Sequence, residues 1–230
     1  MTASLAVVVF PGSNCEQDVA AASRGLGAEP VMVWHNDTEL PDADIVVLPG
    51  GFAHGDYLRT GALARFSPIM DAVRAHAEAG KLVIGICNGF QILCEAGLLP
   101  GALRKNAGLK FLCKWVELRV DNAETPFTAR ANEGDILRIP INHFEGSWYC
   151  DETEYAELAA RGQVVLRYLD NPNGSHDSVA GLCNESFNVF GLMPHPERAC
   201  EQVLGSVDGA VILGSMFDRF SARIVQGVTT

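Results

Sequence analysis

Short apolar runs alternate with helical patterns through the first half of the chain. The runs, rich in Val, Ile and Leu as buried strands are, are residues 5–10, 30–35, 44–51 and 81–87. Between them, residues 15–27 have helical spacing, and Ile69, Val73 and His76 would share one face of another helix. Such alternation predicts an α/β fold whose parallel sheet is covered on both faces. Ligands of such sheets bind at the carboxyl ends of the strands.

Two helix starts carry polar signals. Ser13 followed by Glu16 fits a capping box for the first helix. Ser67 and Pro68 fit the cap and the first position of the second. Glycines follow both helical patterns and would end them.

The pattern changes after about residue 108, where shorter alternating stretches begin. These stretches are residues 110–120, 135–142, 163–169 and 187–193. Alternation of this kind indicates antiparallel strands, which we expect to extend the parallel sheet. Residues 207–225, with Ile212, Met216 and Ile224 among the apolar positions, predict a closing amphipathic helix.

Length and charge narrow the possible functions. At 230 residues and 48% hydrophobic residues, the chain predicts a single α/β domain over residues 1–230. Its formal charge of −11 argues against nucleic acid as a partner. The first apolar run is only six residues long and has no basic residue before it, which suits neither a signal peptide nor a membrane span. We expect a cytoplasmic location.

The seven cysteines are scattered and form no C-x-x-C pair. A disulfide framework and a zinc site are therefore both poorly supported, and we expect no metal. In a reducing compartment most cysteines are small, buried hydrophobic residues. We therefore first expect each of the seven to have this packing role.

Cys87 departs from this because it stands in Gly85-Ile86-Cys87-Asn88-Gly89, after a predicted strand and before a helix. A nucleophile elbow is such a strand-to-helix turn, in which flanking glycines let the chain hold its central residue in a strained conformation. The pattern predicts an exposed, strained cysteine. Cys94, further along the same helix, keeps the packing role.

A reactive thiolate needs further help. Lowering the thiol pKa from about 8.5 to 7 requires roughly 2 kcal/mol, whereas a helix N-terminus supplies only about 0.3 to 1 kcal/mol. Among six histidines, His195 lies between two prolines with Glu197 two residues later. In an extended backbone these side chains point the same way, so Glu197 can orient His195 as a base for Cys87. Without the Cys87 motif, the segment around His195 and Glu197 would be interpreted as a rigid turn with a surface histidine.

Thiolate attack on an acyl group also needs donors for the oxyanion. The backbone N–H of Asn88, directly after Cys87, is one candidate. The backbone N–H of Gly51, in the Pro49-Gly50-Gly51 turn after a neighbouring strand, is the other.

These residues resemble the class I glutamine amidotransferases, which carry G-x-C-x-G-x-Q after a strand and a later H-x-E. The matching positions are Gly85, Cys87, Gly89, Gln91, His195 and Glu197. Further matching stretches, at residues 10–18, 49–62, 85–103, 171–175 and 191–199, are similar to free-standing glutaminase subunits of purine-biosynthesis complexes. The resemblance implies a flavodoxin-like, mostly parallel sheet with helices on both faces.

The resemblance also implies the chemistry. Cys87 would attack the side-chain amide of glutamine, releasing ammonia and leaving a glutamyl thioester for hydrolysis, while Gln91 and the Gly51 loop hold the substrate. Ammonia would pass to a large synthetase subunit that uses ATP and magnesium, with a small bridging subunit between them and no cofactor in this chain. We expect weak glutaminase activity from the isolated chain.

Two other interpretations remain open at this point. A cysteine-elbow hydrolase or stress-response protein of similar fold would not need His195, Glu197 or Gln91. A partner-binding scaffold without chemistry would not need the Cys, His and Glu set. One departure from the family concerns His143-Phe144-Glu145, where a smaller residue commonly stands between histidine and glutamate; these residues are expected near the site or a partner, or simply at a strand end.

Overall fold

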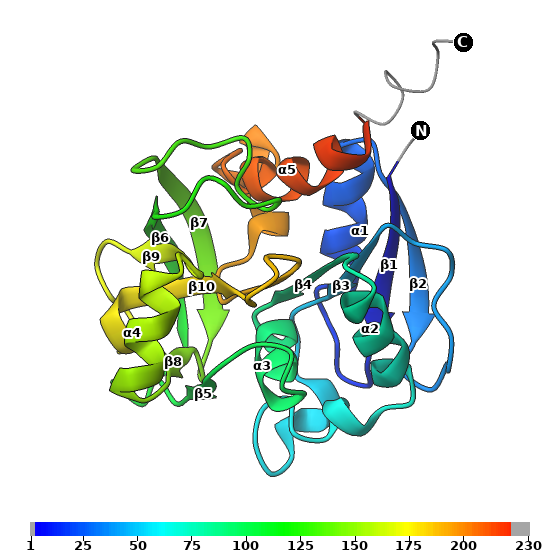
Figure 1. Ribbon diagram of the computed structural model, residues 1–230, viewed down its shortest axis with the longest axis horizontal. Coiled ribbons are helices and arrows are strands. Elements are labelled where there is room, and N and C mark those ends of the chain that lie inside the picture. Colours follow the sequence, from blue (N-terminus) through cyan, green and yellow to red (C-terminus); the bar gives the residue numbers. More distant parts are fainter. Residues whose placement is uncertain (1–2, 222–230) are drawn as a thin grey trace.

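One mixed sheet runs through the middle of the protein (Figure 1). The computed structural model describes residues 3–221. The sheet has the strand order β2-β1-β3-β4-β11-β10-β9-β6-β7. Pairing is parallel from β2 to β11 and antiparallel from β11 to β7. The nine strands are β1 (Ser4–Val9), β2 (Glu29–Trp34), β3 (Ile45–Leu48), β4 (Leu82–Ile86), β6 (Leu112–Val120), β7 (Ile136–His143), β9 (Val164–Tyr168), β10 (Val179–Cys183) and β11 (Val189–Leu192).

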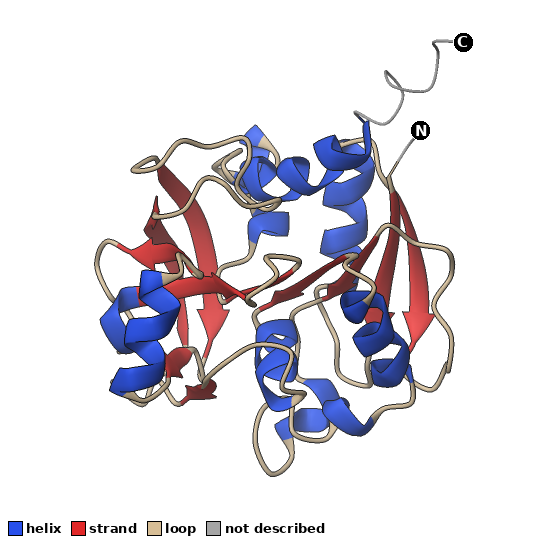
Figure 2. Ribbon diagram, viewed as in Figure 1, coloured by secondary structure: helices blue, strands red, loops and turns tan. Residues whose placement is uncertain are grey.

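Helices cover both faces of the parallel part, as Figures 1 and 2 show. The α1 and α5 helices lie on one face, and α2 and α3 lie on the other. The helices are α1 (Glu16–Gly25), α2 (Ile69–Glu78), α3 (Asn88–Glu95), α4 (Glu152–Ala160) and α5 (Gly209–Ser221). The predicted fold class, a parallel sheet covered on both faces and extended by antiparallel strands, is confirmed.

The core lies at the central parallel strands. Every residue of β3 and β4 is buried. Burying each large aliphatic side chain contributes roughly 1.5–3 kcal/mol, so these strands fix the middle of the sheet. Their carboxyl ends consequently occupy defined, adjacent positions on one edge of the sheet.

Both predicted helix starts are wrong in detail. No side chain caps α1: Ser13 Oγ instead accepts a hydrogen bond from the Phe10 N–H at 3.0 Å, and Cys15 takes the N-cap position. The reason is that Ser13 belongs to a turn bridged to Gly51, outside the helix. At α2, Ser67 Oγ hydrogen-bonds His35 Nδ1 at 3.2 Å and leaves the helix uncapped.

The second half differs from expectation in one strand direction. Three of the four alternating stretches form antiparallel strands β6, β7 and β9, but β11 runs parallel to β4 and is antiparallel only to β10. The intervening β10, which reverses the chain beside β9, was not predicted. Nor were α4 or the short antiparallel pair of β5 (Ala102–Arg104) and β8 (Ser147–Tyr149).

The closing helix begins at Gly209, two residues later than predicted. Ile212 and Met216 on α5 are buried, as the pattern indicated. Ile224 and the end of the predicted helix at Val225 lie outside residues 3–221. Across the described range, no helix combines the length and apolar character that a membrane span requires.

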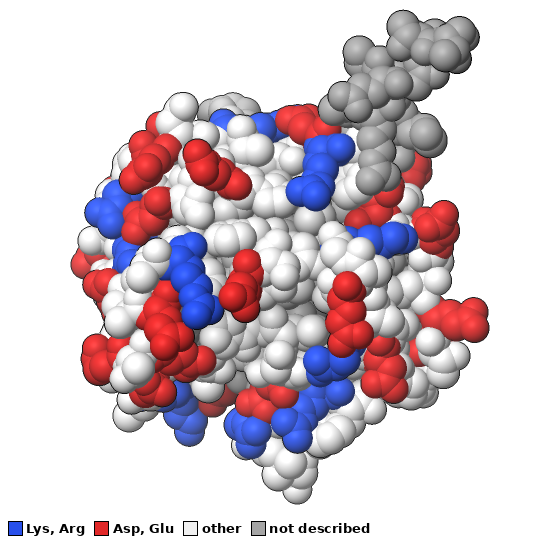
Figure 3. Space-filling model, in the orientation of Figure 1, with Lys and Arg blue, Asp and Glu red and all other residues white. Residues whose placement is uncertain are grey.

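Acidic and basic side chains are interspersed on the face seen in Figure 3, around a largely uncharged centre. No continuous basic track crosses this face. This face therefore offers no extended match to a phosphate backbone.

Candidate active site

Cys87 lies between the end of β4 and the start of α3 with a positive φ in a sparsely populated backbone conformation, φ 52° and ψ −104°. Such a conformation costs a non-glycine residue on the order of 1–3 kcal/mol and persists only where the surroundings enforce it. Two backbone hydrogen bonds do so here: Cys87 N–H donates to Leu192 O at 2.8 Å, and Gln91 N–H donates to Cys87 O at 3.2 Å. The strained strand-to-helix turn predicted from the sequence is present. The prediction of an exposed cysteine is wrong, because β7 packs over the turn: Cys87 is only 5% exposed, and its Sγ donates to Asn142 O at 3.7 Å.

The flanking glycines are required by close packing of α3 against two strands. A Cβ on Gly89 would lie 1.9 Å from Leu48 O of β3, and one on Gly85 would lie 2.6 Å from the Gly89 backbone. Any larger residue at these positions would push α3 away from the sheet. The G-x-C-x-G spacing therefore sets how closely Cys87 approaches the end of β3.

His195 and Glu197 form a buried pair in which His195 Nδ1 lies 2.6 Å from Glu197 Oε1. The carboxylate accepts this bond, so the donor is Nδ1–H and the lone pair of the neutral ring is on Nε2. Residues 196–198 form a 3₁₀ turn rather than the extended backbone we assumed. The expected bond nevertheless forms, because the turn folds the carboxylate back toward the ring.

The environment of His195 favours its cationic form. Burial acts to lower the pKa of His195, but the charges of Glu197 and Cys87, together with the nearby thiols of Cys15 and Cys87, raise it well above its usual range. His195 Nε2 has no hydrogen-bond partner within residues 3–221. A buried, unpartnered Nε2 beside Cys87 is in place to take up and return a proton.

Cys15 is a neighbour of His195 that sequence reasoning assigned to packing. Its Sγ, a ring nitrogen of His195 and a carboxylate oxygen of Glu197 lie within 4.8 Å of one another. The only sequence signal was its place in the stretch of residues 10–18. A metal ion here would have to displace the His195–Glu197 bond and the Arg198 guanidinium, which donates to Cys15 Sγ at 3.2 Å. The set therefore fits a metal poorly.

A cavity of about 200 Å³ opens beside Cys87. Its size suits a small metabolite rather than a polymer. The lining residues are Gly51, Phe52, Asp56, Thr60, Cys87, Gln91, Asn142, His143, Phe144 and Glu145. From the sequence, His143–Glu145 was expected either near the site or a partner or simply at a strand end. The structure places this segment in the lining of the cavity.

The two expected oxyanion donors have unengaged N–H groups. Gly51, with φ 152°, donates no backbone N–H bond within residues 3–221. The Asn88 N–H is in the first turn of α3, where backbone N–H groups have no partner inside the helix. Gly51 follows β3 and Asn88 follows β4, so the parallel pairing of these strands brings both groups to one sheet edge.

Side chains of α3 connect the elbow to the cavity walls. Asn88 Oδ1 accepts from the Ala53 N–H at 3.0 Å, and Asn88 Nδ2 donates to Gln91 Oε1 at 2.8 Å. Gln91 Nε2 in turn donates to Glu145 O at 2.5 Å. Gln91 thus holds the wall formed after β7.

Three adjacent parallel strands therefore deliver the predicted residues to one place. Gly51 follows β3, Cys87 follows β4, and His195 follows β11. A cysteine on a strained elbow, a His–Glu pair and free backbone donors at the carboxyl edge of an α/β sheet define the thiol-dependent amidotransferase type of site.

Comparison with known proteins agrees with this class. The chain belongs to the CobB/CobQ-like glutamine amidotransferase domain family, whose model matches residues 2–210. It is similar to the phosphoribosylformylglycinamidine synthase subunit PurQ of Rubrobacter xylanophilus, with 54% identity over 210 residues that cover 91% of this chain and 96% of the relative. The PurQ subunit of Trichormus variabilis is 52% identical over 218 residues, covering 94% and 97%.

A solved structure gives the same result. One chain of PurLQS from Thermotoga maritima superposes with a TM-score of 0.89 at 47% identity, covering 96% of this chain and all of that one. At this level of identity, the likeness extends beyond the fold to the sequence itself.

Proposed function

We propose that this protein is the glutaminase subunit of a phosphoribosylformylglycinamidine synthase, a carbon–nitrogen ligase that takes its nitrogen from glutamine. The single observation that carries the proposal is the strained Cys87 next to the buried His195–Glu197 pair. Relatives named as PurQ, matched over nearly the whole chain, support the particular ligase. One amidotransferase domain over residues 1–230 is part of the proposal.

The first half-reaction forms a thioester. His195 Nε2 accepts the Cys87 proton, and the thiolate attacks the side-chain amide carbon of glutamine. The Asn88 and Gly51 N–H groups stabilise the oxyanion; loss of one such donor typically costs about 3–4 kcal/mol. His195 then gives its proton to the amide nitrogen, and the C–N bond breaks. Ammonia departs, and the glutamyl group stays bound to Cys87 as a thioester.

The second half-reaction regenerates the thiol. His195 removes a proton from water, and the resulting hydroxide adds to the thioester. The C–S bond then breaks to release glutamate, and His195 returns its proton to the Cys87 sulfur. Glu197 keeps His195 in the same tautomer through both steps. Gln91 holds the cavity wall at Glu145, which keeps the bound glutamine facing Cys87.

The ammonia is used by partners. We propose that a large synthetase subunit, with ATP and magnesium, converts the substrate's amide to the amidine of formylglycinamidine ribonucleotide in purine synthesis. A small subunit bridges the two, and this chain needs no cofactor of its own. The superposition on a chain of PurLQS supports an assembly of this kind. The cytoplasmic location stays a prediction.

Alkylation by a glutamine analogue tests the proposal. The reconstituted complex is treated with an analogue that carries an electrophile in place of the amide, and the labelled peptide is mapped. We expect label on Cys87, protection by glutamine, and weaker labelling of the isolated chain. No label on Cys87 in the complex would overturn the proposal.

The Cys87→Ala variant separates chemistry from structure. It should lose glutamine-dependent amidine formation while the complex keeps its ammonia-dependent rate, because the synthetase site is untouched. Cys94→Ala, on the α3 helix that follows Cys87, is the matched control and should keep both activities. Equal loss of both activities in Cys87→Ala would assign the residue a structural role.

A further inference from the structure

The turn that carries His195 and Glu197 ends at Arg198, whose guanidinium contacts a helix from the other end of the chain. Arg198 Nε donates to Asp18 Oδ2 at 3.0 Å, and Nη2 donates to Cys15 Sγ at 3.2 Å. Both acceptors lie at the start of α1, where Cys15 takes the N-cap position. These contacts join residues that are 180 and 183 positions apart, so one side chain fastens the turn to α1.

Cys15 can accept this bond because its own proton is used elsewhere. Its Sγ donates to Asn14 Oδ1 at 3.1 Å, which leaves the sulfur lone pairs for Arg198. The Cys15 backbone N–H donates to Gly50 O at 3.2 Å, next to Gly51, the expected oxyanion donor. Arg198 therefore connects the turn that bears the base, through the start of α1, to the turn after β3.

Arg198 also brings a permanent positive charge to a buried carboxylate. The Glu197 side chain is 0% exposed, and its Oε2 has no hydrogen-bond partner within residues 3–221. A buried carboxylate without a compensating charge is costly, and His195 is cationic only during part of the reaction, whereas a guanidinium stays protonated. Burial acts to lower the pKa of Arg198, but neighbouring groups, Cys15 and Glu197 first among them, raise it above its usual value.

We propose that Arg198 is a positioning residue for the His195–Glu197 pair. It fixes the turn so that His195 faces Cys87, and its charge balances Glu197 while His195 is neutral. The inference rests on the proposed function. Arg198 is not among the described residues that line the cavity, so it acts through the pair and not on the substrate. Its planar group presents two donors to two acceptors at once, which a lysine cannot do.

The groups around the turn set the direction of a pH effect. The titratable and charged groups on α1, the elbow, β7 and the turn itself are Cys15, Asp18, Cys87, His143, His195, Glu197, Cys200 and Glu201. Removing a fixed positive charge lets nearby groups take up protons more readily. Without the charge of Arg198, the reactive form of the site should therefore appear at a higher pH.

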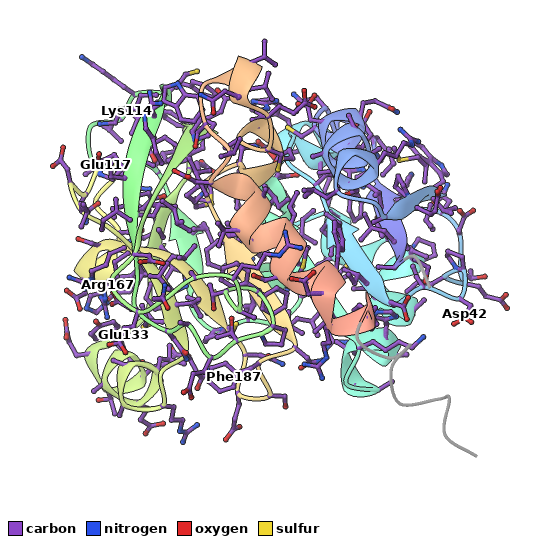
Figure 4. All side chains as sticks on the ribbon, turned by 90° about the horizontal axis from the view of Figure 1, so that it is seen from above. Asp42, Lys114, Glu117, Glu133, Arg167 and Phe187 are labelled. Atoms are coloured by element: carbon purple, nitrogen blue, oxygen red, sulfur yellow. The ribbon has the colours of Figure 1, made fainter. Side chains whose placement is uncertain are left out.

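Two substitutions at Arg198 separate charge from geometry. Arg198→Gln removes the charge, whereas Arg198→Lys keeps it but reaches only one of the two acceptors. Arg167→Gln is the control, because its guanidinium also bridges two segments, donating to Asp121 and Asp177. Arg167 lies in the antiparallel part of the protein, away from α1 (Figure 4), and its side chain is 14% exposed against 32% for Arg198. A purely structural effect should therefore be at least as large in this control.

We expect Arg198→Gln to lower kcat for glutamine in the complex about 10- to 100-fold, with KM changed less than about threefold, because a misplaced base loses rate. Arg198→Lys should recover part of this loss, Arg167→Gln should keep the wild-type kcat, and the ammonia-dependent rate should stay constant in all three. Cys15→Ala should lower kcat about 3- to 10-fold alone, but less than about twofold when added to Arg198→Gln, because both changes break the same contact.

The pH dependence of Cys87 alkylation supplies a measure that needs no turnover. The rate of reaction with iodoacetamide is followed over a pH series, and the midpoints are compared. We expect the midpoint to move up by about 0.5 to 1 pH unit in Arg198→Gln. It should stay at the wild-type value in Arg198→Lys, which keeps the charge, and in Arg167→Gln.

The outcomes distinguish this inference from the proposed function. Equal losses of kcat in Arg198→Gln and Arg167→Gln, or a loss that tracks the unfolded fraction in urea, would mean a structural role and would overturn the positioning. An unchanged alkylation midpoint in Arg198→Gln would overturn it too, as would wild-type kcat in both Arg198→Lys and Cys15→Ala. A wild-type complex that does not hydrolyse glutamine would overturn the proposed function, while the alkylation midpoints would still decide whether Arg198 acts on Cys87.

Discussion

Gly50 leaves the space that the His195 ring occupies, and filling that space tests the geometry of the site. In Gly50→Ala the new Cβ would lie 2.8 Å from His195 Cε1 and 3.0 Å from Cys15 Sγ. Ordinary contacts begin at 3.4 Å, so the ring must move by about 0.6 Å and the thiol by about 0.4 Å. The ring is also tied to Glu197 at 2.6 Å, so it would tilt about that bond.

The expected effect is on turnover more than on folding. A misplacement of about 1 Å in a catalytic group can cost about 100-fold in rate, so we expect a loss of about 10- to 100-fold in glutamine hydrolysis. Overpacking costs about 1–3 kcal/mol, which a protein with about 5–15 kcal/mol of unfolding free energy tolerates. The complex is assayed with glutamine and with ammonia, and urea unfolding gives the stability.

Gly108→Ala is the matched control, because a Cβ at Gly108 meets nothing within 4 Å. This variant should keep wild-type turnover. Wild-type glutamine turnover in a folded Gly50→Ala protein would refute the reasoning, because it would mean that the position of His195 does not limit the reaction. A loss that tracks the unfolded fraction would refute it as well.

Three further predictions concern the His195–Glu197 pair, the elbow at Cys87 and the carboxyl group of Asp56. Glu197→Gln should lower glutamine turnover by about 100-fold or more. It should also lower the pKa of His195, because burial then dominates. An unchanged pH profile of Cys87 alkylation would contradict this. Gly89→Ala should destabilise the fold by more than about 3 kcal/mol in urea unfolding, because its Cβ meets backbone at 1.9 Å, and a smaller loss would show that α3 can shift. The pKa of Asp56 is raised to about 6 on folding, so the folded state holds this proton more tightly and stability falls as pH rises from about 4 through 6. Asp56→Asn should therefore be more stable than the wild type at pH 7.5 but not at pH 4, and equal differences at both pH values would disprove the assignment.

Local sequence was sufficient where the structure depends on neighbouring residues. The elbow at Cys87 was predictable because its strain and its glycines lie within five positions. The His195–Glu197 bond was predictable from a spacing of two, although a 3₁₀ turn makes it rather than an extended strand. Apolar runs without alternation located β3 and β4, because strands buried on both faces need no polar side.

Prediction failed where a distant segment competes for the same group. Ser13 had the right residue type and spacing for a cap, yet its turn is bridged to Gly51 and its hydroxyl accepts from Phe10 instead. Strand β11 was expected to be antiparallel, but direction depends on which strand lies beside it, and its neighbour is β4. Ser13 and Gly51 are 38 positions apart, and Val189 and Val83 of β11 and β4 are 106 positions apart, so no local pattern encodes either pairing.

The sequence by itself determined the class of fold, the strained elbow at Cys87 and the His195–Glu197 pair, because periodicity, glycine placement and short spacing act over a few residues. Only the tertiary structure decided that Cys15 lies against His195 and that Asp56 and Glu145 line one cavity. Strand order brings these residues together from distant parts of the chain. The physical reason is that packing selects which buried surfaces meet, and charge and hydrogen bonding then act between whichever groups that packing has made neighbours.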